Sequence, residues 1–177
     1  MAEKSFEQLS SEFNTAAEGW MTGATSAATL TLRFNILLRH CTETEDNKHW
    51  LVTKLLETTL KRLGCLTPDT ATDGLTDSFM EQYSTVLDAL AAPEAACVMP
   101  EKAPRALADI ALDVLDLRNG SKLMHTERHT YDVFSGLLLS YADKFAATIS
   151  KRNLENPTPQ HIAVPKQITL KKPAAAQ

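Results

Sequence analysis

The sequence predicts an all-α protein: a single-domain antiparallel bundle of about six helices with a flexible C-terminal tail. The main observation is that apolar residues recur at steps of three and four through most of residues 1–152, as in helices that bury one face. A second is that no two segments alternate as partner strands would. The third is an aromatic content of only 6%, because a mainly aliphatic core suits the packing of helix on helix.

The composition limits the classes of function. At 177 residues and 44% hydrophobic content, the chain is long enough to bury one core without disulfides or structural metals. From Lys151 onward five basic residues stand against one acidic residue, whereas residues 1–150 carry 13 basic and 21 acidic residues. The body is thus acidic and the tail basic. An acidic body disfavours nucleic acid as a partner, since phosphate binding needs clustered Lys and Arg.

The cysteines and the apolar runs predict the compartment. Cys41, Cys65 and Cys97 show no CxxC spacing, and an odd number of cysteines favours reduced thiols over a disulfide framework. The N-terminus lacks the basic region and apolar region of a secretory signal. The longest strongly apolar run, near residues 30–38, is too short to cross a bilayer. We therefore expect a cytoplasmic protein without a membrane partner.

Capping signals define the first helix. Ser5 and Gln8 have the spacing of a capping box, in which the serine hydroxyl accepts from a backbone N–H and the glutamine reaches back. An apolar face follows at helical spacing. Gly19 or Gly23 is expected to end this helix or loosen it.

The second and third helices follow polar turns. Thr25 or Ser26 is the expected cap of the second helix, whose apolar residues cover so much of its circumference that burial on two sides is predicted. A polar segment at residues 42–47 then turns the chain into the third helix. Gly64 fits the position just beyond the end of that helix.

Prolines bound the next two helices. The fourth helix starts with Asp73 or Thr76 as its cap and stops before Pro93. Residues 93–104 hold three prolines and are expected to form a loop, with Pro104 in the first turn of the fifth helix. That helix has one apolar face and two further leucines on another side; these are Leu107, Ile110, Ala111, Val114 and Leu117, and then Leu112 and Leu115.

The last helix is expected to be the longest. Asn119 and Gly120 close the fifth helix, Ser121 caps the next, and one apolar stripe runs over residues 121–152. We interpret this helix as a central post against which the earlier helices pack. Gly136 interrupts it at a cost of about 1 kcal/mol relative to Ala, so it marks either a close helix approach or an exposed, tolerated position.

One pair of histidines is a candidate metal site. His125 and His129 are four residues apart, so they share a helix face and can both reach one ion, with Asp132 about one turn further on. The glutamate that directly follows the first histidine in zinc proteases is missing, and other ligands would have to come from elsewhere. We therefore favour an exposed polar turn and expect no bound metal or cofactor.

No other catalytic pattern is complete. His40 is next to Cys41, but neighbouring helix positions point about 100° apart, which disfavours a nucleophile and its base. Asp109, Asp113 and Asp116 recur along the fifth helix as residues of a solvated face do. The chain has no phosphate-binding glycine loop and no GxSxG motif. We therefore expect no enzymatic activity.

The tail, residues 153–177, is the most suggestive feature outside the helical body. It contains four prolines and no helical period, so we expect a flexible, partly extended segment. Such a segment can add to a partner as a strand or extended peptide. The expected partner-binding residues are Ile162, Val164, Lys166, Ile168 and Leu170. The alternative is a passive, solvated chain end.

These observations favour a non-enzymatic protein–protein interaction module: an adaptor, a chaperone-like factor or a small subunit of a larger assembly. The second and fifth helices support this hypothesis, since their apolar residues exceed what one neighbouring helix can cover, and surplus apolar surface marks an interface. A protein partner or self-association would cover it. The alternative is a helical-bundle metal-binding protein or enzyme that uses the face of His125 and His129.

Overall fold

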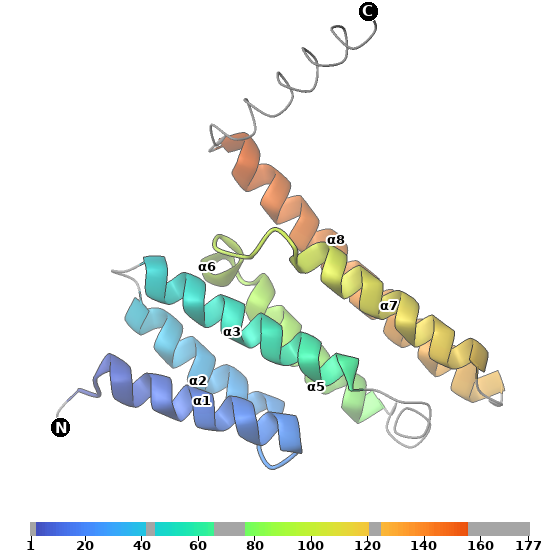
Figure 1. The fold of residues 1–177 in the computed structure, drawn as a ribbon, viewed down its shortest axis with the longest axis horizontal. Coiled ribbons are helices and arrows are strands. Elements are labelled where there is room, and N and C mark those ends of the chain that lie inside the picture. The colour runs from blue at the N-terminus through green and yellow to red at the C-terminus, as the bar shows by residue number, and fades with distance from the viewer. Residues whose placement is uncertain (1–2, 42–44, 66–76, 121–124, 156–177) are drawn as a thin grey trace, which may run out of the picture.

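The computed structural model describes residues 3–41, 45–65, 77–120 and 125–155. Every regular element in these four ranges is a helix, which confirms the all-α prediction. The helices are α1 (Phe6–Thr22), α2 (Ala27–His40), α3 (Glu45–Gly64), α5 (Asp77–Ala91), α6 (Pro93–Ala96), α7 (Ala103–Gly120) and α8 (His125–Glu155). Figure 1 shows α1, α2, α3 and α5 packed together, with α7 and α8 as a long antiparallel pair beside them.

The helix α1 begins and ends at residues suited to those positions. The hydroxyl of Ser5 accepts from the backbone N–H of Gln8, and the Gln8 side chain accepts from the backbone N–H of Ser5, so the capping box is complete. Gly23 ends the helix with a φ of 82°, which glycine adopts without strain. Gly19 is needed for a different reason, because a Cβ there would lie 2.0 Å from Thr25 Oγ1 in the α1–α2 turn.

The helix α2 is buried on two sides, as its apolar circumference predicts. Ser26 is its N-cap and accepts from the backbone N–H of Thr29. The helix α1 packs along one side of α2 and α5 along another, with α3 also in contact (Figure 1). Leu32 is the large apolar side chain of α2 that remains exposed.

Two details in the middle of the chain differ from the prediction. Gly64 is the last residue of α3 and not a left-handed residue beyond it, since Gly23 is the glycine with positive φ in the described part. Pro93 opens the short helix α6 in a region predicted as a loop, because a proline at the first helical position loses no hydrogen bond. Pro104 does lie in the first turn of α7. The other expected caps lie outside the described residues; they are Asp73, Thr76 and Ser121.

The helix α8 is the longest helix, but the expectation that it is a central post is wrong. It packs mainly along α7, lies at one side of the structure (Figure 1) and continues to Glu155, three residues beyond the expected end. The central place is shared by α5, which contacts α2, α3, α6 and α8, and α3, which contacts α1, α2, α5 and α7. Helical periodicity reports that a face is buried, but it does not report how many helices share that face.

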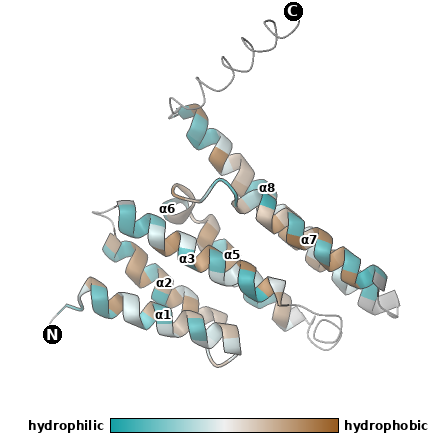
Figure 2. Cartoon of the chain, viewed as in Figure 1, coloured by the Kyte–Doolittle hydropathy of each residue, from teal (hydrophilic) through white to brown (hydrophobic). Residues whose placement is uncertain are grey.

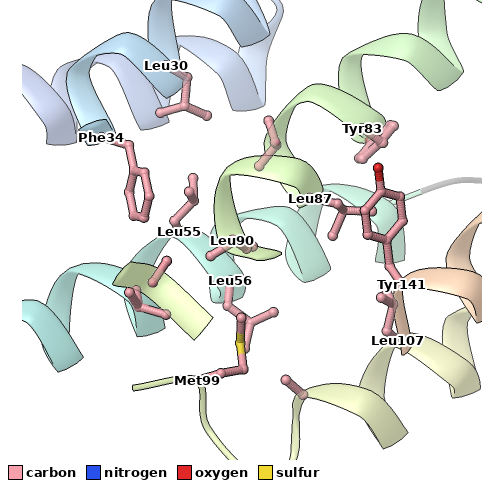
Figure 3. Close-up of a cluster of buried hydrophobic side chains, with 14 of the residues drawn as sticks. Leu30, Phe34, Leu55, Leu56, Tyr83, Leu87, Leu90, Met99, Leu107 and Tyr141 are labelled. Atoms are coloured by element: carbon pink, nitrogen blue, oxygen red, sulfur yellow. The ribbon is translucent and has the colours of Figure 1, made fainter. Parts of the chain in front are cut away.

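One continuous hydrophobic core joins the two groups of helices. Figure 3 shows its middle, with Leu55 and Leu56 of α3, Leu90 of α5 and Leu107 of α7. All four of these leucines are fully buried. The chain is therefore a single packed body over its described residues, and α7 and α8 contribute to the same core as α1 to α5.

Aromatic rings link the outer pair to the rest of the body. Phe134 of α8 lies against Phe79 and Tyr83 of α5, with ring centroids 5.8 and 5.7 Å away. Tyr83 in turn contacts Trp20 of α1 at 5.5 Å. Such edge and tilted pairs stabilise by about 0.5–1.5 kcal/mol beyond their buried area. This aromatic cluster, Trp20, Phe79, Tyr83 and Phe134, thus connects α1, α5 and α8.

Two polar contacts fix how α8 sits. The Ser135 hydroxyl donates to the backbone oxygen of Ala111 at 2.9 Å, which sets the register of α8 against α7. The Tyr141 hydroxyl donates to the carboxylate of Asp88, and the backbone oxygen of Ser84 lies 3.3 Å from it. Burial, together with the hydrogen bond to Asp88, raises the pKa of Tyr141 to about 12. The Ser135 hydroxyl is therefore paired within the buried interior, and the Tyr141 hydroxyl is paired at its half-buried edge.

Tyr83 is the contrasting case. Its hydroxyl is buried, and no group in the described part of the chain forms a hydrogen bond with it. Burial raises the pKa of Tyr83 to about 12, and the nearby guanidinium of Arg62 partly opposes this shift. The ring of Tyr83 therefore stabilises the fold through packing, whereas its hydroxyl gains nothing from the interior.

The substitution Phe134→Ala tests the aromatic cluster. It removes a fully buried ring that joins α8 to α5, so we expect the free energy of unfolding to fall by about 3–5 kcal/mol in denaturant titrations. The neighbouring Val133→Ala is the matched control, because Val133 is exposed and its loss should change stability by about 0.5 kcal/mol or less. Equal effects of the two substitutions would contradict this packing.

The two tyrosines should respond differently to the loss of their hydroxyls at neutral pH. We expect Tyr141→Phe to lower the free energy of unfolding by about 1 kcal/mol, since it breaks a hydrogen bond to Asp88. Tyr83→Phe should leave stability unchanged or raise it slightly, because it removes a buried hydroxyl without a partner. Urea titrations of both variants provide the measurement. A larger loss for Tyr83→Phe would show that its hydroxyl has a partner.

The same phenols predict the behaviour at high pH. In the unfolded chain a tyrosine titrates near pH ~10, whereas both phenols keep their protons to about 12 in the folded chain. The folded state thus binds more protons between these values, and the free energy of unfolding must fall as pH rises through this window. Thermal unfolding between pH 9 and about 12 should show a smaller loss for Tyr83→Phe than for the unchanged chain.

Candidate interaction surface

Exposed apolar side chains concentrate on α7 and α8. Six large hydrophobic side chains in the described ranges remain exposed. Four of them belong to the outer pair, namely Leu112, Val133, Leu139 and Leu154. Leu32 on α2 and Trp50 on α3 are the other two. Figure 2 shows hydrophobic residues along the length of both α7 and α8, so this pair is the first place to look for an unfilled interface.

The geometry of the pair places Leu112 and Leu139 on the same seam, offset by about 7.5 Å along the helices. Ser135 binds Ala111 across the antiparallel interface, which defines the register (Figure 1). Leu139 is one turn beyond Ser135, so it lies on the edge of α8 that faces α7. Leu112 follows Ala111 directly. Helical side chains lean toward the N-terminus of their own helix, so in an antiparallel pair Leu112 and Leu139 lean toward each other.

Gly136 leaves the surface open beside these leucines. A Cβ at Gly136 would meet no atom within 4 Å, which confirms the exposed position and excludes a close helix approach within the described chain. Leu112, Val133 and Leu139 are 56%, 45% and 39% exposed. Leu112, the half-buried Leu115 and Leu139 lie along the seam between α7 and α8, whereas Val133, about 160° around α8 from Ser135, points away from α7. We name this strip the hairpin face: Leu112, Leu115, Gly136 and Leu139.

Three carboxylates lie on the solvated side of α7. Asp109, Asp113 and Asp116 are all exposed, in agreement with the prediction of a solvated face. None of the three forms an ion pair within the described ranges, whereas Asp132 of α8 pairs with Arg118 of α7. Asp113 and Asp116 line a hollow of about 240 Å³ with Leu63 and Gly64 of α3, so these two carboxylates lie toward α3 and not beside the hairpin face. The pair of Arg118 and Asp132 ties α7 to α8.

The hollow between α1 and α3 is a weaker candidate. It measures about 550 Å³, and Trp50 lies on its wall. Carboxylates and ammonium groups alternate around it; they are Glu18, Lys54, Glu57 and Lys61. Because these charges offset one another, the hollow favours neither an anion nor a cation. Trp50 itself packs edge-on against Phe6 and Phe13, with ring centroids 6.5 and 6.4 Å away, which gives it a structural role.

A second hollow of about 580 Å³ lies beside the α1–α2 turn and contains Arg62. The guanidinium carbon of Arg62 is 4.4 Å from the ring centroid of Trp20 and 5.6 Å from that of Tyr83. One of its nitrogens, Nη1, is buried without a hydrogen-bond partner in the described residues. Glu81 lines the same hollow and offsets the positive charge. Arg62 thus acts through stacking on the aromatic cluster.

The structure does not assemble a metal site around the two histidines. His129 is exposed, and the side chain of His125 lies outside the described residues. Asp132, the expected third ligand, is held by Arg118. In the described ranges no group of three or more His, Cys, Asp or Glu side chains is arranged to hold an ion. The metal-binding alternative therefore gains no support from this geometry.

His40 and Cys41 do not act as a pair. The ring of His40 is exposed and stacks on Phe6 at a centroid distance of 6.3 Å. Cys41 is fully buried, and burial raises the pKa of its thiol, although Lys48 opposes the shift. A protonated, buried thiol is a poor nucleophile. Catalysis by Cys41 is disfavoured by its position, as the sequence spacing indicated.

The expected partner-binding residues of the tail lie outside the described residues; they are Ile162, Val164, Lys166, Ile168 and Leu170. The prediction for them stays a prediction. Sequence reasoning singled out Leu112 but missed Val133 and Leu139. Neither residue fits the three-and-four spacing of the buried stripe on α8. This misfit is the feature of the sequence that could have identified them as exposed.

None of the protein-family models, curated proteins and solved structures with which the chain was compared matches it. Over the described residues, none of the helices has the length and apolar content that crossing a membrane requires. The function therefore has to be argued from the residues of the chain itself.

Metal analysis tests the remaining alternative. We expect purified protein to carry no stoichiometric zinc by elemental analysis, because Asp132 is committed to Arg118 and one exposed histidine binds zinc weakly. The experiment should compare the unchanged chain with His129→Ala after purification in zinc-containing buffer and dialysis. One equivalent that persists in the unchanged chain and vanishes in His129→Ala would restore the metal-binding hypothesis.

Proposed function

We propose that the chain is a non-enzymatic protein–protein interaction module with an acidic helical body and a partner-binding tail. It would act as an adaptor, a chaperone-like factor or a small subunit of a larger assembly in the cytoplasm. The observation that supports this proposal is the hairpin face, where the exposed Leu112 and Leu139 of two antiparallel helices lie along one seam. Large apolar side chains gathered on one face are typical of an interface.

The composition of the hairpin face suits a protein partner. Interfaces combine an apolar centre with a polar rim, and here Leu112 and Leu139 supply the centre while Asp109 supplies part of the rim. The complementary surface would carry apolar side chains flanked by Lys or Arg. A second copy of the chain is the less suitable occupant, because residues 1–150 carry a formal charge of −8 and two such bodies repel each other.

The contacts that hold α7 and α8 in place beneath the hairpin face also favour binding. Ser135 and the pair of Arg118 and Asp132 hold α7 and α8 in one register, and Phe134 anchors α8 on α5. The backbone of residues in two packed helices is already ordered, so it loses little conformational entropy when a partner binds. The entropy that a partner must offset on binding is therefore smaller than it would be for a loop.

The test replaces the two leucines of the apolar centre with aspartate. Its effect on affinity is compared with that of the same change at an equally exposed leucine elsewhere. We expect the double variant Leu112→Asp, Leu139→Asp to lose about tenfold or more in affinity for a partner that the unchanged chain retains. Leu32→Asp is the matched control, since Leu32 is 54% exposed and lies on α2. Captures from source cells with the three full-length chains identify the partner, and titration of that purified partner measures the affinity.

Each possible result either supports the proposal or contradicts it. Sedimentation and circular dichroism of the three chains establish that all are folded and report any self-association. A partner lost from the double variant but kept by Leu32→Asp supports the proposal, and so does a dimer that only the double variant loses. If all three chains retain the same proteins with the same affinity and all are monomers, the hairpin face is not an interface with another molecule.

A further inference from the structure

We infer that the hollow of about 240 Å³ between the end of α3 and α7 receives an arginine side chain of a partner protein. The inference rests on the proposed function, because it names a feature of the partner that the interaction module would bind. The hollow is a second contact site, since Ile110, which lines it, and Leu112 of the hairpin face point about 160° apart on α7.

The walls of the hollow suit the aliphatic part of a long basic side chain. Leu63 and Val114 are almost fully buried, and the half-buried Ile110 and Leu117 pack against the core beside them. Arginine and lysine bury their methylene groups along such a surface while the charged end stays among polar groups. Sites for whole small molecules measure roughly 300–1,000 Å³, so a hollow of this size better fits a single side chain.

Two carboxylates give the hollow its charge. Asp113 and Asp116 both line it, and at three residues apart on α7 they are neighbours on the helix surface. Both are exposed, and neither forms an ion pair with a described residue. Arg105, the nearest basic residue before them on α7, is about 12 Å along the helix from Asp113. A planar guanidinium with five N–H donors can bind both carboxylates at once, which a compact ammonium does less well.

The end of α3 favours the same sign of charge. Leu63 and Gly64 are the last residues of α3, and both line the hollow. The C-terminal end of a helix carries about half a negative charge on its unpaired carbonyl groups, so it favours cations. A Cβ at Gly64 would meet no atom within 4 Å, which shows that the chain is open beside this helix end. The helix end and the two carboxylates therefore act together on a bound cation.

The chain supplies no basic residue of its own to this region. Residues 63–101 contain seven acidic residues and no Lys, Arg or His. The basic residues that precede this stretch are engaged elsewhere, since Lys61 lines the hollow between α1 and α3 and Arg62 stacks on the aromatic cluster. On α7, Arg118 pairs with Asp132. The cation that complements this hollow therefore comes from another molecule.

The experiment titrates the full-length chain, labelled at its methyl groups for NMR, with N-acetyl-arginine methylamide at low ionic strength. We expect saturable chemical-shift changes at the methyl groups that line the hollow, namely those of Leu63, Ile110, Val114 and Leu117. N-acetyl-citrulline methylamide has nearly the same shape without the charge and should leave these signals in place. The probe is a single side chain, so the titration tests the site without knowledge of the partner.

Matched variants identify the carboxylates that bind the probe. We expect the double variant Asp113→Asn, Asp116→Asn to raise the dissociation constant about tenfold or more, because both charge-assisted hydrogen bonds are lost. Asp109→Asn is the control, since Asp109 is an exposed carboxylate of α7 that does not line the hollow. All three positions are exposed, so both variants should stay folded, which circular dichroism checks.

The outcomes are distinct. Saturable changes with the arginine probe that the double variant loses and Asp109→Asn keeps support the inference. It is overturned by equal changes with the citrulline probe, by an unaltered affinity of the double variant, or by equal changes along the acidic helix α5, which indicate a diffuse attraction of cations. Equal affinity for N-acetyl-lysine methylamide overturns the assignment to arginine. A hairpin face that binds no partner would remove the proposed function and leave this titration unchanged, so the two proposals fail separately.

Discussion

The contact on which the arrangement depends is the aromatic cluster. Trp20, Tyr83 and Phe134 come from α1, α5 and α8, which are far apart in sequence, and each of these rings is fully buried. The rings attach α8 to the body, while α7 is attached separately through its contacts with α3. These attachments lie on the body side of the pair, opposite to the exposed Leu112.

The sequence predicts the local structure well and the arrangement less well. Capping at Ser5 and Ser26 depends on residues only three positions apart, so the signal is complete within a short window. The position of α8 depends on which helix covers which part of its buried stripe. That is decided by the shapes of facing side chains such as Phe79 and Phe134, which no window of sequence contains. The expectation of a central post failed for this reason.

For the candidate surface, too, the sequence predicts local features better than the spatial arrangement. The pattern of α7 revealed that Leu112 lies off the main apolar face, and this leucine is indeed exposed. For α8 the long stripe of buried residues concealed that Val133 and Leu139 belong to another side. Only the register set by Ser135 and Ala111 shows that Leu139 and Leu112 lie near each other, offset by about 7.5 Å along the pair. Surplus apolar content can be counted in a sequence, but its clustering requires the tertiary structure.

Arg152 adds a mechanical consequence. Its guanidinium donates from Nη1 to the backbone oxygens of Cys97 and Met99, at 3.1 and 2.9 Å, near the exit of α8 toward the tail. These two hydrogen bonds tie the C-terminal end of α8 to the connection between α6 and α7. A displacement of this end of α8 would therefore be transmitted to that connection.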